Sequence, residues 1–272
     1  MKKVIAMGVQ DYAKLKEYDR FYIDKTRFIS DWWQSGDRVT LIARPQGFGK
    51  TLNLTTVECF FSSRYAGRSD LFSGMQVWES EEMRGMQGAY PVIFLSFAGA
   101  VTSKYTTFWH LIRKFILRKF SDLEIYRQKD RFSAEQLEAL GGIGSDMSEE
   151  ETVKALKLLS GLLETICHRK ALILLDDYDS PLREAGDFRY KEEAEAFLQR
   201  LMYHTFEDNP SLERGLIVGM TYHDGKTVLS GIHDLEVIGH TSEKYDDFFG
   251  FTEPEVFKAL SGQDTENLRG RQ

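Results

Sequence analysis

Short runs of apolar residues alternate along this chain with longer segments in which apolar residues recur at helical spacing. The runs are rich in valine, isoleucine and leucine, which is typical of buried strands. They occupy residues 39–42, 91–97, 171–175, 215–221 and 235–238. Amphipathic helices are predicted for residues 50–62 and 104–120, from 149 toward 167, and around 197–201. Strands that alternate with helices indicate an α/β fold, in which right-handed crossovers build a parallel sheet.

Three segments lie outside this alternation. Residues 9–36 are predicted to form a helical cover over one edge of the sheet, with contact to an adenine base or to the loop of residues 44–51 as the alternative. Residues 63–90 are rich in glycine and predict a loop-rich insert. Residues 261–272 are predicted to form a polar tail. We therefore expect one domain over residues 1–260.

A glycine-bearing loop follows the first predicted strand. Residues 44–51 read Arg-Pro-Gln-Gly-Phe-Gly-Lys-Thr and lead directly into a helical pattern, an order that is typical of a phosphate-binding loop. Gly47 and Gly49 let the backbone approach phosphate groups, and a helix N-terminus offers N–H donors to them. Lys50 is predicted to neutralise the β- and γ-phosphates, and the Thr51 hydroxyl to bind Mg²⁺. The predicted nucleotide-binding residues are Arg44, Gln46, Gly47, Phe48, Gly49, Lys50, Thr51, Leu52 and Thr221.

The match to a phosphate-binding loop is incomplete. The full pattern has a glycine five residues before Gly49, where this chain has Arg44, and Pro45 removes one N–H donor. The alternative is a simple turn from strand to helix that carries Lys50 on its surface. A second motif is needed to choose between these interpretations.

That second motif is the acidic end of the third predicted strand. The sequence Ala-Leu-Ile-Leu-Leu-Asp-Asp at residues 171–177 is typical of a buried strand whose C-terminal end carries a carboxylate linked to a metal ion. Asp176 is the predicted Mg²⁺ residue, and Asp177 is predicted to orient or deprotonate the attacking water. Thr221, at the end of the fourth strand, is a candidate sensor of the γ-phosphate. Ligands of parallel sheets bind beyond the strand C-termini, where all these residues are expected. The alternative is a strand that ends in an acidic turn.

Charge and composition limit the classes of function. The chain has 35 basic and 42 acidic residues, a net charge of −7, which argues against bulk electrostatic binding of nucleic acid. A local basic face remains on the helix predicted for residues 104–120, although a solvated helix face is the favoured interpretation; its members are Arg113, Lys114, Arg118 and Lys119. Cys59 and Cys167 lie in apolar helical patterns and are predicted to be buried free thiols.

The chain has no targeting signal that we recognise. The apolar run at residues 4–9 is too short for a signal peptide, and no run approaches the roughly 18 apolar residues of a membrane span. We therefore expect a cytoplasmic protein without a membrane partner.

Several motifs together resemble those of the bacterial AAA-ATPase-like family. They are Phe-Tyr-Ile-Asp-Lys-Thr at 21–26, the loop at 44–51, Leu-Leu-Asp-Asp-Tyr-Asp-Ser-Pro at 174–181, and the segments 241–246 and 249–252. The resemblance implies a P-loop NTPase core of the additional-strand type, with five mainly parallel strands in the order 5-1-4-3-2. Family members often carry a PD-(D/E)XK nuclease-like domain after the ATPase part, for which we expect no room here.

The sequence departs from the family pattern at three places. Gln46 and Gly47 stand where the family has two arginines, Asp177 stands in place of glutamate, and Tyr222 in place of arginine. A shorter water-positioning acid can cost about a hundredfold in rate, and the loss of a transition-state arginine about a thousandfold. Arg44 is a candidate replacement for the lost cation. These departures therefore affect the expected rate more than the expected binding.

Two functions from different classes follow. The first is a Mg²⁺-dependent ATPase, with ATP and Mg²⁺ as cofactors and with Lys50 and Asp177 as catalytic residues. The second is an ATP-binding interaction module with little or no turnover, which would report to a protein partner or to a second copy of the chain. A third possibility is the ATPase half of a longer ATPase–nuclease protein. A P-loop kinase is less favoured because no arginine-rich lid follows the acidic strand.

Overall fold

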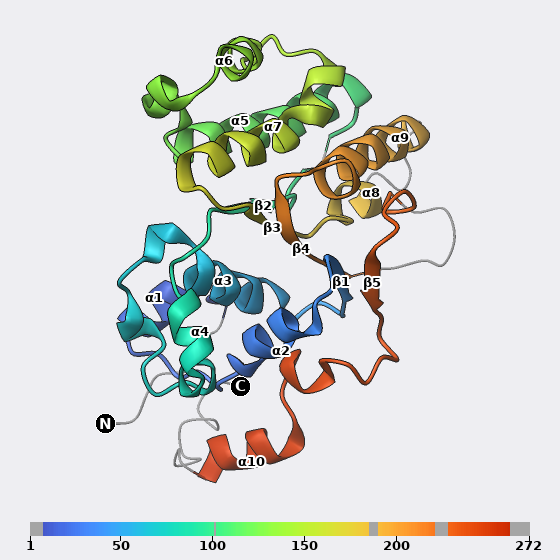
Figure 1. Cartoon of the computed structure of the whole chain (residues 1–272). Coiled ribbons are helices and arrows are strands. Elements are labelled where there is room, and N and C mark those ends of the chain that lie inside the picture. Colours follow the sequence, from blue (N-terminus) through green and yellow to red (C-terminus); the bar gives the residue numbers. More distant parts are fainter. Residues whose placement is uncertain (1–7, 101, 185–189, 221–227, 262–272) are drawn as a thin grey trace.

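The computed structural model describes residues 8–100, 102–184, 190–220 and 228–261. Five parallel strands form one sheet with the order β2-β3-β4-β1-β5 (Figure 1). The strands are β1 (Val39–Ala43), β2 (Val92–Ser96), β3 (Ala171–Asp176), β4 (Leu212–Gly219) and β5 (Leu235–Ile238). This confirms the predicted α/β class, the five strands and the strand order.

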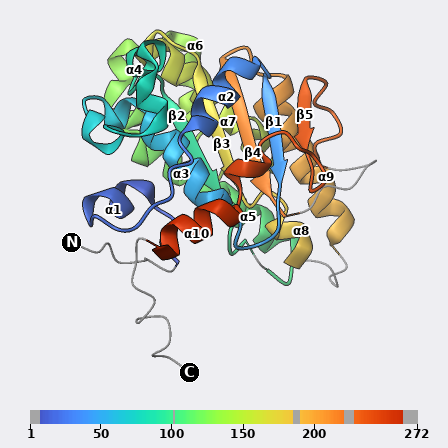
Figure 2. The ribbon, with the colours of Figure 1, turned by 90° about the horizontal axis from the view of Figure 1, so that it is seen from below.

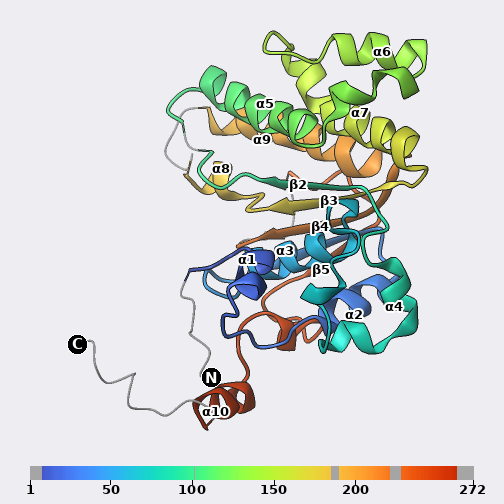
Figure 3. The same cartoon turned by 90° about the vertical axis from the view of Figure 1, so that its left-hand side faces the viewer.

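Continuous apolar sequence marks the strands because both faces of the sheet are covered. Every residue of β1 and of β3 is buried, whereas β5, at the edge, is buried only at Ile238. Figure 3 shows the resulting three layers, with helices on both sides of the strands.

One helical layer packs on the sheet from above in the view of Figure 1. Its main helices are α5 (Tyr105–Asp122), α7 (Glu149–Cys167) and α9 (Lys191–Met202), and α6 (Ala134–Gly141) lies beyond them. The helix α7 starts where the acidic residues predicted it to start, because Ser148 and Glu151 form a reciprocal capping box. Cys167 ends α7 and is only half-buried, which corrects the expectation of a buried thiol, while Cys59 is buried as predicted.

The opposite layer contains α1 (Tyr12–Glu17), α2 (Arg27–Ser35), α3 (Lys50–Phe61) and α4 (Glu81–Met86). The helix α2 does not simply close an edge of the sheet: its buried side chains share one core with α3 and with the strand faces. Trp32 is fully buried there, and its indole N–H donates to the Thr40 hydroxyl on β1 at 3.1 Å.

The predicted insert at 63–90 belongs to this same layer. It consists of α4 and three single turns of 3₁₀-helix at Ser63–Tyr65, Ser69–Leu71 and Gln76–Glu79. Its apolar side chains are buried in the core that α2 and α3 share; these are Leu71, Phe72, Val77 and Met83. The insert is therefore a packed cover rather than an open loop.

After β5 the chain crosses back over the second layer. We call residues 239–252 the C-terminal strap; it includes a 3₁₀ turn at Asp246–Phe248 and leads into α10 (Glu253–Ser261). The short helix α8 (Ser180–Glu184) follows β3. In Figures 2 and 3, α8 lies at the edge of the sheet where β1 leads into the loop to α3.

The parallel register collects the ends of the strands at that edge. Ala43 at the end of β1 pairs with Gly219 of β4, and Ser96 at the end of β2 pairs with Asp176 of β3. No helix of the described residues has the length and apolar character needed to cross a membrane. The predicted polar tail lies, apart from its first residue, outside the described part of the chain.

The space around two glycines predicts opposite effects on the free energy of unfolding when each is replaced by alanine. A Cβ on Gly215 would lie 2.7 Å from the Phe206 ring and 3.3 Å from Val39 Cγ1, both fully buried. Gly215→Ala should cost about 1–3 kcal/mol of unfolding free energy through overpacking. A Cβ on Gly161, within α7, has its nearest neighbour at 3.7 Å, so Gly161→Ala should stabilise the protein by about 0.5–1 kcal/mol. Urea unfolding of both variants checks the signs; shifts in the same direction would contradict this packing.

Candidate functional site

The loop between β1 and α3 has the backbone shape of an anion-binding turn. Gly47 and Gly49 have φ angles of +85° and +72°, in the left-handed region that favours glycine. An added Cβ at either position meets nothing within 4 Å, so the requirement is conformational rather than a matter of crowding. Residues 45–49 are exposed to solvent at the end of the sheet.

The N–H groups of this loop point to no acceptor within the described chain. No hydrogen bond of the described residues is donated by the amides of residues 46–49. Gly49 is the N-cap of the 12-residue helix α3, and no side chain caps that helix terminus. The first N–H groups of a helix lack partners within the helix and favour an anion there. The loop and the start of α3 therefore offer a cluster of donors to a phosphate group.

Lys50 lies beneath the loop. Its side chain is only 7% exposed, and its Nζ donates to the carbonyl groups of Arg44 at 2.9 Å and Pro45 at 2.8 Å. Burial lowers the pKa of Lys50, while nearby Asp177 and Asp176 oppose that shift. The structure thus brings a cation to the centre of the turn, which disagrees with a lysine on an open surface.

Two hydroxyl groups contact the carboxylate at the end of β3. Thr51 Oγ1, on the first turn of α3, donates to Asp176 at 3.1 and 3.2 Å, and Ser96 Oγ, on β2, donates to it at 3.3 Å. The glycine loop and the acidic strand, 125 residues apart in sequence, are therefore in direct contact. Carboxylate and hydroxyl oxygens are ligands of the kind that Mg²⁺ accepts.

The ionised form of the Asp176 carboxylate is destabilised by its surroundings. It is 3% exposed, and burial together with the neighbouring charge of Asp177 raises its pKa to about 6. The hydrogen bonds from Thr51 and Ser96 and the charge of Lys50 act in the opposite direction but do not offset the burial. A divalent cation at this point would supply the compensating charge that the protein groups leave incomplete.

The segment after β3 is fixed to the end of β4. Asp177 has a positive φ of 49°, which turns the chain sharply. Asp179 is buried and accepts from the Met220 N–H at 3.2 and 3.3 Å, and its Oδ2 lies 3.3 Å from Arg183 Nε on α8. Tyr178 packs so closely on Gly219 that an added Cβ there would lie 2.5 Å from its ring.

Sequence reasoning missed two residues of this cluster. Ser96 occupies the last position of a predicted strand, so the rule that strand C-termini meet at one edge could have found it. Asp179 lies inside the motif at 174–181, but no local pattern separates it from an ordinary turn residue. Only the structure brings it to Met220.

The remaining residues that were predicted to bind the nucleotide lie in other surroundings. The Arg44 guanidinium is buried against the C-terminal strap, where it donates to the carbonyl groups of Gly239 and Ser242, so its contacts lie away from Lys50. Phe48 is half-exposed at the tip of the loop, and its carbonyl accepts from a strap amide. Gln46 is exposed, Leu52 is half-buried, and Thr221 and Tyr222 lie outside the described residues.

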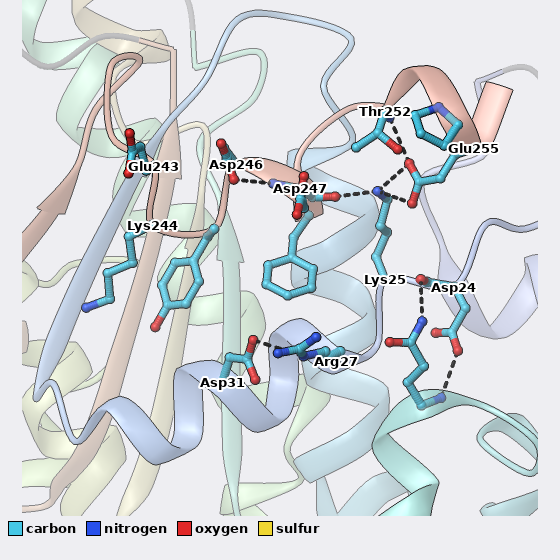
Figure 4. Close-up of a pocket in the computed structure, with 14 residues that line it drawn as sticks. Asp24, Lys25, Arg27, Asp31, Glu243, Lys244, Asp246, Asp247, Thr252 and Glu255 are labelled. Carbon is cyan, nitrogen blue, oxygen red and sulfur yellow. Dashed lines mark hydrogen bonds and ion pairs between the residues drawn. The ribbon is translucent and has the colours of Figure 1, made fainter.

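The strap and the N-terminal segment enclose a pocket of about 720 Å³ beside α3 (Figure 4). Lys25, only 7% exposed, crosses it, donating to the Asp247 carbonyl and, at 2.6 and 2.7 Å, to the Glu255 carboxylate at the start of α10. Asn53 of α3 donates to the Phe248 carbonyl at 2.7 Å. Lys25 therefore anchors the strap and α10, and its contacts are with these segments rather than with the loop of residues 44–51.

Three of the four basic residues predicted to form a local face on α5 have partners within the described chain. The Arg113 guanidinium donates to the Met147 carbonyl, and Arg118 and Lys119 both lie near Asp122. These contacts support the interpretation of a solvated and internally paired helix face.

The fold and this edge of the sheet define an ATPase-like protein, and the sequence comparison names the family. The chain matches the family described as Predicted AAA-ATPase over residues 6–226 and belongs to it. It is also similar to an uncharacterized protein encoded in the vnfD 5′ region of Azotobacter chroococcum mcd 1, with 25% identity over 276 residues. That alignment covers 98% of this chain and 48% of the relative, so the chain spans about half the length of that protein.

The raised pKa of Asp176 predicts a gain in stability on its neutralisation. Its pKa lies above the ordinary value of 3.8, so the folded state binds the proton more tightly and unfolding free energy falls as pH rises from about 4 to 6. Asp176→Asn, in the presence of EDTA, should therefore be more stable than the parent protein by about 2–3 kcal/mol at pH 7, with no gain below about pH 4.

Denaturation midpoints between pH 3.5 and 8 measure this difference. Asp208→Asn serves as the control, because the Lys157 ammonium lowers the pKa of Asp208 and the variant should gain no stability at pH 7. A destabilised Asp176→Asn at pH 7 would contradict the assigned electrostatic cost.

Proposed function

We propose that this protein is a Mg²⁺-dependent ATPase with a P-loop NTPase fold. Membership of the AAA-ATPase family, the strand order and the shape of the glycine loop support this function. The observation that carries it is the contact of the Thr51 hydroxyl with the Asp176 carboxylate, beside a loop whose amides have no acceptor in the described chain.

Each group has a role in this proposal. The amides of residues 46–49 and the start of α3 bind the phosphate chain, and Lys50 exchanges its two carbonyl partners for β- and γ-phosphate oxygens. Thr51 and Asp176 hold Mg²⁺, which neutralises charge on the phosphates. Asp177 aligns the attacking water.

The residues present fit a magnesium ion. No group of three or more His, Cys, Asp or Glu is arranged for a metal ion among the described residues. Mg²⁺ needs no such cage, because it is commonly bound by one or two carboxylates together with water and the substrate's phosphates. One buried carboxylate with an adjacent hydroxyl is therefore sufficient on the protein side.

A nucleotide-binding module with little turnover is the second candidate. The observation in its favour is Asp177, whose side chain is one methylene shorter than a glutamate and whose backbone turns at φ +49°. In that case the strap, which is bonded to Phe48, Asn53 and Arg44, would carry the binding signal to a partner.

Loss of Lys50 should weaken nucleotide binding and abolish turnover. Lys50→Ala removes the buried cation from the loop, and we expect phosphate release from Mg²⁺·ATP to fall to background and ATP affinity to fall at least about tenfold. Phosphate release and calorimetric titration measure the two effects. Lys157→Ala, which breaks an ion pair with Asp208 on the upper layer, is the matched control. Activity that survives in Lys50→Ala would remove the site from consideration.

The two candidates differ in their response to a longer acid. If the protein binds ATP but barely hydrolyses it, Asp177→Glu should raise turnover, by up to about a hundredfold, since it moves the carboxylate by about an ångström. Asp177→Ala should abolish any turnover while nucleotide affinity changes little. Single-turnover phosphate release separates these cases; equal rates in all three proteins would exclude Asp177 from water alignment.

A further inference from the structure

Arg183 lies at the same edge of the sheet as the predicted nucleotide site. It belongs to α8, which follows the acidic end of β3 and lies near the edge where β1 ends (Figures 2 and 3). Its side chain is 31% exposed, so it is partly held and partly open to solvent. The helix α8 begins at Ser180, three residues after Asp177, so Arg183 belongs to the segment that leaves β3 at the predicted site.

One side of the guanidinium is held by an ion pair. Arg183 Nε lies 3.3 Å from Asp179 Oδ2, and Asp179 is itself buried and bonded to the Met220 N–H at the end of β4. The arginine is therefore fixed to both strands that flank the site.

Among the described residues, the other side of the guanidinium has only a weak partner. The Nη1 group of Arg183 contacts the sulfur of Met220. A thioether is a poor acceptor, so a phosphate oxygen in the same place would form a far stronger, charge-assisted bond. A guanidinium whose Nε is paired with a carboxylate and whose Nη1 contacts a thioether is suited to bind an anion through Nη1.

Arg44, which the sequence suggested as a replacement for the lost cation, has other contacts. The Arg44 guanidinium is buried under the strap and is bonded to carbonyl groups there. Arg183 is paired with Asp179, which is bonded to the Met220 N–H directly after β4, and β4 ends beside the strand that leads into the glycine loop.

We propose that Arg183 is a catalytic residue that binds the γ-phosphate of ATP and stabilises the charge that develops during its hydrolysis. Asp179 is the positioning residue that fixes it. This inference rests on the proposed function and deepens it, since it assigns recognition of the triphosphate, in distinction from the diphosphate, to α8.

The reaction balances without a further reactant. The oxygen of water forms a bond to the γ-phosphorus, and the bond from phosphorus to the bridging oxygen breaks with its electron pair remaining on ADP. The proton of the water passes to solvent by way of Asp177 or the released phosphate. Arg183 changes no bond; it donates hydrogen bonds to γ-phosphate oxygens on which charge accumulates.

The test compares Arg183→Ala, Arg183→Lys and the control Arg200→Ala. Arg200 has a comparable exposure of 43% and is paired with Glu149 and Glu150 of the upper helical layer. Affinities for ADP and for the non-hydrolysable β,γ-imido analogue of ATP are measured with Mg²⁺ by calorimetry, and turnover by phosphate release.

Arg183→Ala should lower turnover about a thousandfold, as expected for a transition-state arginine. It should weaken binding of the imido analogue about tenfold, with ADP affinity changed by less than about twofold, because ADP lacks the γ-phosphate. Arg183→Lys should recover analogue affinity in part and turnover little, since a lysine cannot reproduce the planar fork. Arg200→Ala should match the parent protein in every measurement.

Asp179→Asn tests the positioning role, because asparagine keeps an acceptor for the Met220 N–H but removes the charge that holds Arg183. We expect turnover to fall about tenfold and the preference for the analogue over ADP to shrink. A change in melting temperature with an unaltered preference would instead assign Asp179 a structural role and overturn its positioning role.

The outcomes separate this inference from the proposed function. If Lys50→Ala abolishes binding but Arg183→Ala keeps both turnover and the preference for the analogue, the assignment of Arg183 is overturned and the proposed function stands. Equal loss of ADP and analogue affinity in Arg183→Ala also overturns it. If the parent protein binds without hydrolysis, the preference for the analogue decides alone. If the parent protein binds neither nucleotide, both proposals fall.

Discussion

The contact between the Thr51 hydroxyl and the Asp176 carboxylate is the interaction on which the arrangement of this site depends. It joins the start of α3, which follows β1, to the end of β3. The parallel sheet places both at the same edge, with β4 between β1 and β3. The carboxylate is buried without full compensation, which costs stability in the absence of a cation. In the proposed function, a divalent ion bound at this point would compensate the negative charge of this carboxylate.

Different groups surround this contact on its two sides. On one side the glycine loop presents N–H groups and Lys50 to an anion. On the other side, Asp179 in the segment after β3 accepts from the Met220 N–H directly after β4 and forms an ion pair with Arg183. The C-terminal strap closes over the loop and α3 through Arg44 and Asn53, and Lys25 anchors it from the N-terminal segment. The loop, α3, the strap and α10 are therefore linked by direct contacts.

Much of the fold could be predicted because its signals are local. The apolar runs gave five strands, since strands covered on both faces need continuous apolar sequence, and the acidic residues 149–151 gave the start of α7. The strand order came from the family motifs rather than from periodicity. Side-chain partners could not be predicted: Arg44 serves the strap instead of the phosphate loop, and Asp179 and Ser96 gain their roles from residues far along the chain. Cys167 is half-buried because it ends α7 rather than lying within the helix.

The sequence by itself determined the chemistry available at this edge: a lysine and a threonine after two glycines, and a pair of aspartates after a buried strand. These depend on backbone conformation and apolar pattern, which neighbouring residues specify. Only the tertiary structure decided which charged groups are neighbours, because the parallel register sets the ends of β1, β3 and β4 together across more than a hundred residues. The pKa of Asp176 and the partners of Arg183 follow from that register and from burial, and neither is a property of a local segment.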